Sequence, residues 1–272
     1  MNKIFVELYP YKLFTFHEAS KIIKNIQVCR NNINRLTKQD IIIRLKAGIY
    51  YIKPLDNPDF YPDPIHIASK LRPDSVICSN TALKVLKLSN TQGSLQSSSD
   101  SIIYLGSKHP SKLRIGRYIY KIIRNFNFGM DKIEYQTSYG KFELKVTDIE
   151  RTILDCLRTR SVKAEELINI LRTKPVELSL KKVLNYLERY DMPILYNKIG
   201  MILDLCRQNL KVDETEFEKI RKKLTKKIYY YKERGIKLIR PRYHYYKEWN
   251  IMIPDHQYEL VKTLKPAVVA QT

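Results

Sequence analysis

The hydrophobic pattern over the first 54 residues predicts two helices followed by a β-hairpin. Thr15 and Glu18 have the T-x-x-E spacing of a capping box at the start of a helix. The apolar residues that follow recur at helical spacing and form one stripe: Ala19, Ile22, Ile23 and Ile26. A second helix is expected from about residue 28 to residue 38. Its apolar positions fall on one face, which we expect to be buried: Cys29, Ile33 and Leu36.

The next segment, QDIIIRLKAGIYYIKP (39–54), predicts a short hairpin. Hydrophobic and polar positions alternate on both sides of Gly48, which supplies the backbone freedom that a tight turn requires. The first strand is expected to direct apolar side chains to one face and basic ones to the other: Ile41, Ile43 and Leu45, against Arg44 and Lys46. Two helices followed by a hairpin is the order of a winged helix-turn-helix, which we therefore predict for residues 1–54.

The remainder of the chain predicts strands followed by helices. Prolines at 54, 58, 62 and 64 cannot continue a helix or a central strand, so residues 55–65 are interpreted as a linker. Strands are expected at 75–79, 101–105, 113–124 and 141–146. Helices are expected from residue 148, with Thr147 as the N-cap, and at 164–171, 180–190, 194–206 and 214–234. The predicted fold class is α+β: a winged helix-turn-helix, a mixed β-sheet and helical domain (66–234), and a basic, tyrosine-rich extension (235–272).

Charge indicates the class of partner. The chain has 49 Lys and Arg against 28 Asp and Glu, a formal net charge of +21. The electrostatic field of so positive a protein favours a polyanionic partner, most often nucleic acid. Within residues 1–54 the basic residues outnumber the acidic ones ten to three. The alternative is a lysine-rich surface that follows from a composition rich in Ile, Lys, Asn and Tyr, and the distribution of the charge decides between the two.

The polar face of the second predicted helix is the main candidate site. It contains no acidic residue, whereas protein surfaces normally mix the two signs. Arginine can bind guanine edges and asparagine adenine edges in the major groove, so four residues are expected to read bases: Arg30, Asn31, Asn34 and Arg35. Three others are better placed for phosphates of double-stranded DNA: Lys38, Arg44 and Lys46. The alternative is a solvated face that happens to be basic.

Two later regions could extend this interface. Residues 107–124 carry six basic side chains: Lys108, Lys112, Arg114, Arg117, Lys121 and Arg124. Residues 216–249 interleave basic residues with tyrosines: Lys222, Lys223, Lys226 and Lys227 with Tyr229–Tyr231 and Tyr243–Tyr246. Aromatic side chains beside basic ones suit base stacking and backbone contact, so DNA, RNA or a protein surface could bind there. Ordinary packing of a C-terminal helix and strand is the alternative.

A catalytic site is only weakly indicated. Asp131, Glu143 and Lys145 have the order of a carboxylate followed by E-x-K on a strand, as in Mg²⁺-dependent restriction-type nucleases. Asp148 and Glu150 are about 200° apart on a helix, which argues against a shared metal ion. We therefore interpret Glu150 as a capping partner, with Arg151 beside it on the surface. No H-E-x-x-H, phosphate-binding glycine loop or G-x-S-x-G occurs. We therefore expect no enzyme, no cofactor and no metal site, with the nuclease as the alternative.

Cysteine spacing and hydropathy indicate the compartment. The four cysteines lie far apart without a C-x-x-C, which argues against zinc or a disulfide framework and favours core positions in a reducing cytoplasm: Cys29, Cys78, Cys156 and Cys206. No apolar run approaches the roughly 20 residues that cross a bilayer, and the first residues lack an apolar signal-peptide segment. A cytoplasmic protein with no membrane partner is therefore expected.

Several stretches together carry a family resemblance. They are INRLTKQDIIIRLKAGIYYIKP (33–54), SVICSNTALKVLKLS (75–89), LKVTDIERTILDCLR (144–158) and MPILYNKIGMILDL (192–205), and the V-T-x-x-E-R-T-x-x-D run in the third is the most specific. The chain resembles the AbiEi antitoxin family, the transcription-regulator half of AbiE-type (type IV) toxin–antitoxin pairs. Asp40 departs from the pattern, because members of the family often have glycine before the wing.

The resemblance implies a function for each end of the protein. An N-terminal winged helix would bind the promoter of its own operon and repress it. A C-terminal domain would counter a nucleotidyltransferase-like toxin, without direct contact being required. A stand-alone regulator with no toxin is the alternative, and a nucleotidyltransferase gene beside this one would distinguish the two.

Overall fold

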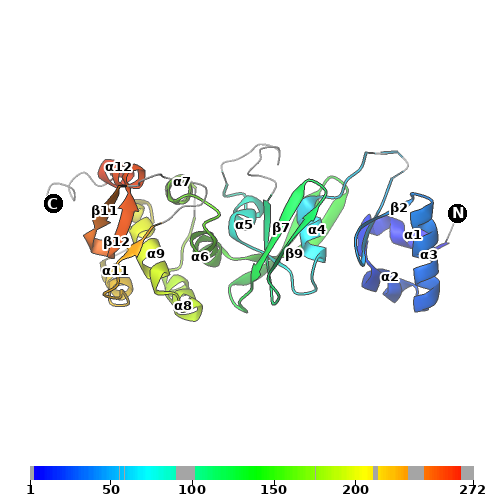
Figure 1. The fold of residues 1–272 in the computed structure, drawn as a ribbon, viewed down its shortest axis with the longest axis horizontal. Coiled ribbons are helices and arrows are strands. Elements are labelled where there is room, and N and C mark those ends of the chain that lie inside the picture. The colour runs from blue at the N-terminus through cyan, green and yellow to red at the C-terminus, as the bar shows by residue number, and fades with distance from the viewer. Residues whose placement is uncertain are drawn as a thin grey trace. The chain divides into compact units, whose positions relative to one another are not determined.

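The computed structural model describes residues 3–54, 56–57, 59–89, 102–174, 176–210, 214–231 and 242–264. Positions 55 and 58 of the predicted linker, and 235–241 and 265–272 of the predicted C-terminal extension, lie outside this description. The fold is α+β with mixed sheets, as predicted (Figure 1). The chain divides into two compact units, the first formed by residues 1–77 and 93–146 and the second by residues 78–92 and 147–272.

The first 54 residues form helices and a small sheet. In chain order the elements are α1 (Lys3–Leu8), η1 (Tyr9–Tyr11), β1 (Leu13–Thr15), α2 (Phe16–Ile22), α3 (Ile26–Lys38), β2 (Ile42–Lys46) and β3 (Ile49–Ile52). The strands are antiparallel in the order β1-β3-β2, so β2 is an edge strand. The predicted capping box is confirmed, since the Glu18 amide donates to Thr15 Oγ1 at 3.1 Å and the Thr15 amide donates to Glu18 Oε2 at 2.8 Å.

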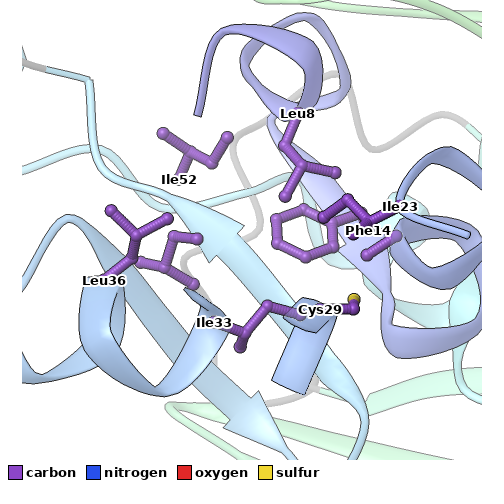
Figure 2. Packing of buried hydrophobic residues seen from close by; sticks show 9 residues of the cluster. Leu8, Phe14, Ile23, Cys29, Ile33, Leu36 and Ile52 are labelled. Atoms are coloured by element: carbon purple, nitrogen blue, oxygen red, sulfur yellow. The ribbon is translucent and has the colours of Figure 1, made fainter. Parts of the chain in front are cut away.

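One apolar cluster holds these elements together (Figure 2). It contains Leu8, Phe14, Ala19, Ile23, Cys29, Ile33, Leu36, Ile42 and Ile52. The predicted buried face of α3 is confirmed. Two other expectations are wrong. Ile26 is 58% exposed, because the chain turns at Ile23–Asn25 and Ile26 begins α3 instead of continuing α2. In β2 the core position belongs to Ile42, while Ile41, Ile43 and Leu45 are only half-buried. The side chains therefore alternate in the opposite phase to the one predicted, and a β-bulge interrupts the pairing farther along, between Arg44 and Lys46.

The rest of the first unit is a six-stranded mixed sheet with one short helix. Its elements are α4 (Pro64–Lys70), β4 (Val76–Ile77), β5 (Ile102–Ser107), β6 (Ser111–Ile115), β7 (Tyr118–Arg124), β8 (Met130–Thr137) and β9 (Gly140–Thr147). The strand order is β6-β7-β5-β4-β9-β8, with β5 parallel to β7 and β4 parallel to β9. The single strand predicted at 113–124 is a hairpin, because the chain reverses at Gly116 (φ 55°). The sequence analysis missed β8.

The second unit is mainly helical. It contains α5 (Ser79–Val85), α6 (Ile149–Thr159), α7 (Ala164–Thr173), α8 (Leu180–Tyr190), α9 (Pro193–Leu205), α10 (Arg207–Leu210), α11 (Glu214–Arg221) and α12 (Asp255–Leu264). A small sheet, β10 (Tyr229–Tyr230), β11 (Tyr243–Tyr246) and β12 (Ile251–Pro254), has the order β10-β12-β11, with η2 (Lys247–Trp249) before β12. Four predicted helices are confirmed, α6 to α9. The helix predicted at 214–234 ends at Arg221, and residues 232–234 lie outside the described chain.

Two general expectations can be compared with the fold. All four cysteines are free and buried, as predicted. Over the part of the chain that the structure describes, no helix combines the length and apolar character needed to cross a membrane.

Candidate nucleic-acid interface

Helix α3 is fixed in orientation by its cap and its buried face. Asn25 is the N-cap, and its Oδ1 accepts a hydrogen bond from the Val28 amide at 3.0 Å, which satisfies one of the free amides of the first turn. On the inner face Cys29, Ile33 and Leu36 are at most 2% exposed. The helix therefore cannot rotate without exposing this apolar face, and its opposite face is held outward.

All five polar residues predicted on α3 lie at the surface. They are Arg30, Asn31, Asn34, Arg35 and Lys38, and each is exposed. At 100° per residue, Asn31 and Lys38 lie about 170° from the centre of the buried face, whereas Arg30 lies only about 95° from it. The structure therefore brings Asn31, Asn34, Arg35 and Lys38 onto one outward stripe. Arg30 lies at the flank of that stripe.

A fifth member of this stripe was not predicted from the sequence. Gln27 is exposed, and its Nε2 donates to Asn31 Oδ1 at 3.1 Å. Glutamine can bind an adenine edge as asparagine does. The missed signal was Asn25, an N-cap residue that places the start of the helix at residue 26 instead of 28.

Neighbouring side chains also restrain Arg35. Its guanidinium donates to Asn32 Oδ1 at 3.0 Å, and Asn32 Nδ2 in turn donates to the Val28 carbonyl at 2.8 Å. This chain of hydrogen bonds runs along the flank of α3. It limits the conformations that the long arginine side chain can take before it meets a ligand.

The hairpin carries the other two predicted basic residues. Arg44 is exposed and lies opposite Tyr50, while Lys46 is half-buried and lies opposite Ile49. Gly48 has φ 78°, a conformation that L side chains rarely adopt, and its carbonyl accepts the Phe16 amide at 2.8 Å. That hydrogen bond ties the turn of the hairpin to the start of α2, so the hairpin and the helices hold a fixed relation.

Residues 16–54 contain two acidic side chains, Glu18 and Asp40. Glu18 is engaged in the capping box and pairs with Lys70 of α4. Burial acts to raise the pKa of Glu18, but its hydrogen bonds to Lys70 and Thr15 leave the pKa lowered overall. Asp40 is the only acid between residues 25 and 55, and it lies just after α3 with φ 54°. This is the left-handed conformation that glycine adopts most easily.

The alternative nuclease residues lie in the six-stranded sheet. Asp131 on β8 and both Glu143 and Lys145 on β9 are exposed, and the two strands are neighbours. Glu143 Oε1 is 2.8 Å from Lys132 Nζ, so its carboxylate is in a surface ion pair. Within the described ranges, no group of three or more His, Cys, Asp and Glu side chains is placed to hold a metal ion.

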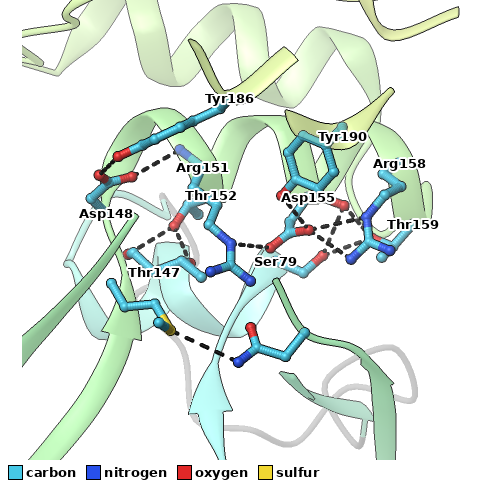
Figure 3. Close-up of polar contacts among 12 residues, drawn as sticks. Ser79, Thr147, Asp148, Arg151, Thr152, Asp155, Arg158, Thr159, Tyr186 and Tyr190 are labelled. Atoms are coloured by element: carbon cyan, nitrogen blue, oxygen red, sulfur yellow. Dashed lines mark hydrogen bonds and ion pairs between the residues drawn. The ribbon is translucent and has the colours of Figure 1, made fainter. Parts of the chain in front are cut away.

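The acidic run of residues 147–155 is built into the interior of the second unit (Figure 3). The N-cap of α6 is Asp148, whose Oδ1 accepts the Arg151 amide at 3.0 Å, and not Thr147 as predicted, because Thr147 ends β9 and its hydroxyl bonds to Thr152 at 2.6 Å. Glu150 does not complete a capping box; instead it accepts the Ser179 amide at 2.9 Å.

The surface position predicted for Arg151 is also wrong, since this residue is 1% exposed. Its Nε is 3.4 Å from Asp155 Oδ2. Asp155 accepts further hydrogen bonds from Arg158 at 2.8 Å and from Tyr190 at 2.9 Å. Burial tends to lower the pKa of Arg158, but the charge of Asp155 leaves it raised overall. These groups link α6 to α8 in the interior.

The chain was compared with protein-family models and with curated proteins. Neither the family models nor the curated proteins searched give a match to the chain.

Proposed function

We propose that this protein is a DNA-binding transcriptional regulator in which residues 1–54 form a winged helix-turn-helix, with α3 as the recognition helix and the β2–β3 hairpin as the wing. One observation carries the proposal: the outward face of α3 is polar, basic and free of acids, and the hairpin that follows α3 in the chain carries two more basic residues. The overall charge of +21 supports an anionic partner but does not by itself distinguish DNA from other polyanions.

The dimensions of α3 suit a major groove. Its 13 residues span about 20 Å, and a helix with side chains is about 10–12 Å across, close to the width of the groove in B-DNA. In this arrangement Gln27, Asn31, Asn34 and Arg35 would meet base edges, and Lys38, Arg44 and Lys46 the phosphates. Binding by this route needs no cofactor.

The regulator is further proposed to act on its own promoter as the antitoxin of an AbiE-like pair. The support for this part is the resemblance carried by residues 33–54, 75–89, 144–158 and 192–205. The partner gene would encode a nucleotidyltransferase-like toxin, countered with or without direct contact. Growth of cells that express the neighbouring gene, with and without this protein, tests the antitoxin role; a stand-alone regulator would give no rescue.

Two substitutions test the DNA-binding surface. Arg35→Ala should cost about 1–3 kcal/mol on the preferred sequence and relax the preference at one base position. Lys46→Ala should weaken binding to all sequences alike and reduce the slope of log affinity against log salt by about one unit. Fluorescence anisotropy with labelled duplexes measures both effects.

A matched control separates the site from the general charge. Lys181→Ala removes one exposed positive charge from α8 in the second unit. It should leave both the affinity and the salt slope unchanged. If Arg35→Ala and Lys46→Ala behave like Lys181→Ala, the assignment of α3 and the hairpin as the DNA surface is wrong.

A further inference from the structure

The small sheet of the second unit has an aromatic outer face. Its register pairs Tyr230 of β10 with Met252 of β12, and Met252 with Tyr245 of β11. Cross-strand partners share a face of a sheet, so these three side chains form one row across the three strands. Tyr243 lies two residues before Tyr245 and therefore shares this face.

The other face of the same sheet is part of the core. Ile251 and Ile253 of β12 are fully buried, and Tyr246 of β11 is 5% exposed. By contrast Tyr230 is 49% exposed and Tyr245 is 45% exposed. The two outer tyrosines are therefore not core residues, and their rings are open to a ligand.

Contacts within this face hold the rings in place. The Tyr230 and Tyr243 rings meet edge to face, with centroids 5.0 Å apart and an interplanar angle of 88°. The hydroxyl of Tyr245 donates to Asn250 Oδ1 at 2.8 Å. Rings that are restrained before binding lose little conformational freedom on stacking with a ligand.

Basic side chains surround the aromatic face in the sequence. Lys226 and Lys227 precede β10, Arg242 precedes β11 and Lys247 follows it, and all four are exposed. Two of the nearest acids have partners within the fold: Glu248 accepts from the Tyr246 hydroxyl at 3.3 Å, and Asp255 pairs with His244. The surroundings of the rings therefore favour an anionic partner that also has flat aromatic groups.

We propose that the outer face of the β10-β12-β11 sheet, with Tyr230 and Tyr245, binds single-stranded nucleic acid. The unpaired bases stack on the two tyrosine rings, and the phosphates lie against the flanking lysine and arginine side chains. A duplex does not fit this description, because its bases are stacked on one another and cannot reach a sheet face. The site is separate from α3 and does not depend on the function proposed above.

Binding of labelled ten-nucleotide oligo(dT) and oligo(rU) to the full-length protein, followed by fluorescence anisotropy, tests the proposal. Tyr230→Ala and Tyr245→Ala should each weaken binding by about 5- to 150-fold, and the corresponding Phe variants should retain it because the ring remains. Lys226→Ala should reduce the salt slope by about 0.7. Comparison of the affinities for oligo(dT) and oligo(rU) shows whether the site prefers single-stranded DNA or RNA.

Two controls make the outcome specific. Tyr11→Ala removes a tyrosine of similar exposure, 48%, from the first unit and should have no effect on the single-stranded probes. Arg35→Ala should also leave them unaffected, whereas it weakens duplex binding if α3 is the recognition helix. Binding that is equal in wild type and in both Tyr→Ala variants would overturn the proposal, and would leave this face to a protein partner. So would a loss shared by the Phe variants.

Discussion

The buried histidine of the first unit predicts a loss of stability in mild acid. The His66 ring stacks on Phe142, with centroids 3.8 Å apart, and its Nδ1 lies 3.0 Å from the Tyr139 hydroxyl. Burial, assisted by the nearby charge of Lys70, lowers the pKa of His66 from 6.5 to about 3. The folded protein therefore keeps this ring neutral at a pH at which the unfolded chain protonates it.

The size of the effect follows from the two pKa values. Above pH 6.5 the ring is neutral in both states, and the contribution of His66 to stability is fully present. Below pH 6.5 the unfolded state binds a proton at His66 and the folded state does not. Between pH 6.5 and 3 the free energy of unfolding therefore falls by up to about 1.4 kcal/mol per pH unit. From pH 7.5 to pH 5 the loss from this one group is about 2 kcal/mol.

The assay compares urea unfolding at pH 7.5 and pH 5 for the wild type, for His66→Phe and for His109→Phe. His66→Phe removes the titrating ring, so its stability should fall by about 2 kcal/mol less than that of the wild type over this range. His109 is exposed, and His109→Phe should behave as the wild type does. An NMR titration that finds His66 protonating near 6.5, or equal pH dependence in all three proteins, would refute the reasoning.

Three further substitutions test individual features of the fold by urea unfolding. Gly48→Ala should destabilise the hairpin by about 1–2 kcal/mol, purely through the backbone, because nothing lies within 4 Å of an added Cβ; an unchanged free energy of unfolding would contradict the positive φ. Gly200→Ala should lower the free energy of unfolding by about 3 kcal/mol or more, because the new Cβ would be 2.2 Å from the Trp249 ring. A free energy of unfolding equal to that of the wild type would mean that Gly200 and Trp249 are not in contact. Tyr190→Phe should cost about 1.5–3 kcal/mol by removing a donor to the buried Asp155, and a neutral result would mean that other donors compensate.

Periodicity alone predicted the part of the fold on which the candidate site depends. Cys29, Ile33 and Leu36 recur at helical spacing, so both the buried face of α3 and the exposed polar face opposite it follow from the sequence. The first residue of the helix was harder to predict, because Asn25 can act as a cap or as an ordinary turn residue. Gln27 was missed as a consequence. Burial in β2 could not be predicted, because Ile41–Ile43 are apolar at every position and leave the phase of the alternation open.

Contacts between distant segments account for the other errors. Arg151 is charged and follows a helix cap, so the sequence favours a surface position. In the structure it is buried beside Asp155, which also accepts hydrogen bonds from Tyr190 and Arg158. Glu150 has the spacing of a capping box, yet its acceptor capacity is used by the Ser179 amide, 29 residues away. The aromatic face of the small sheet likewise depends on the pairing of β10 and β11 with β12.

The most direct test of the central claim is the affinity of the full-length protein for the DNA upstream of its own gene, measured against scrambled DNA of equal length over a range of salt concentrations. A DNA-binding regulator that reads bases through α3 should prefer the upstream fragment, and the preference should persist at high salt, where phosphate contacts weaken. Equal and steeply salt-dependent binding to both fragments would contradict the account, because it would mean that the charge of +21 acts without sequence recognition.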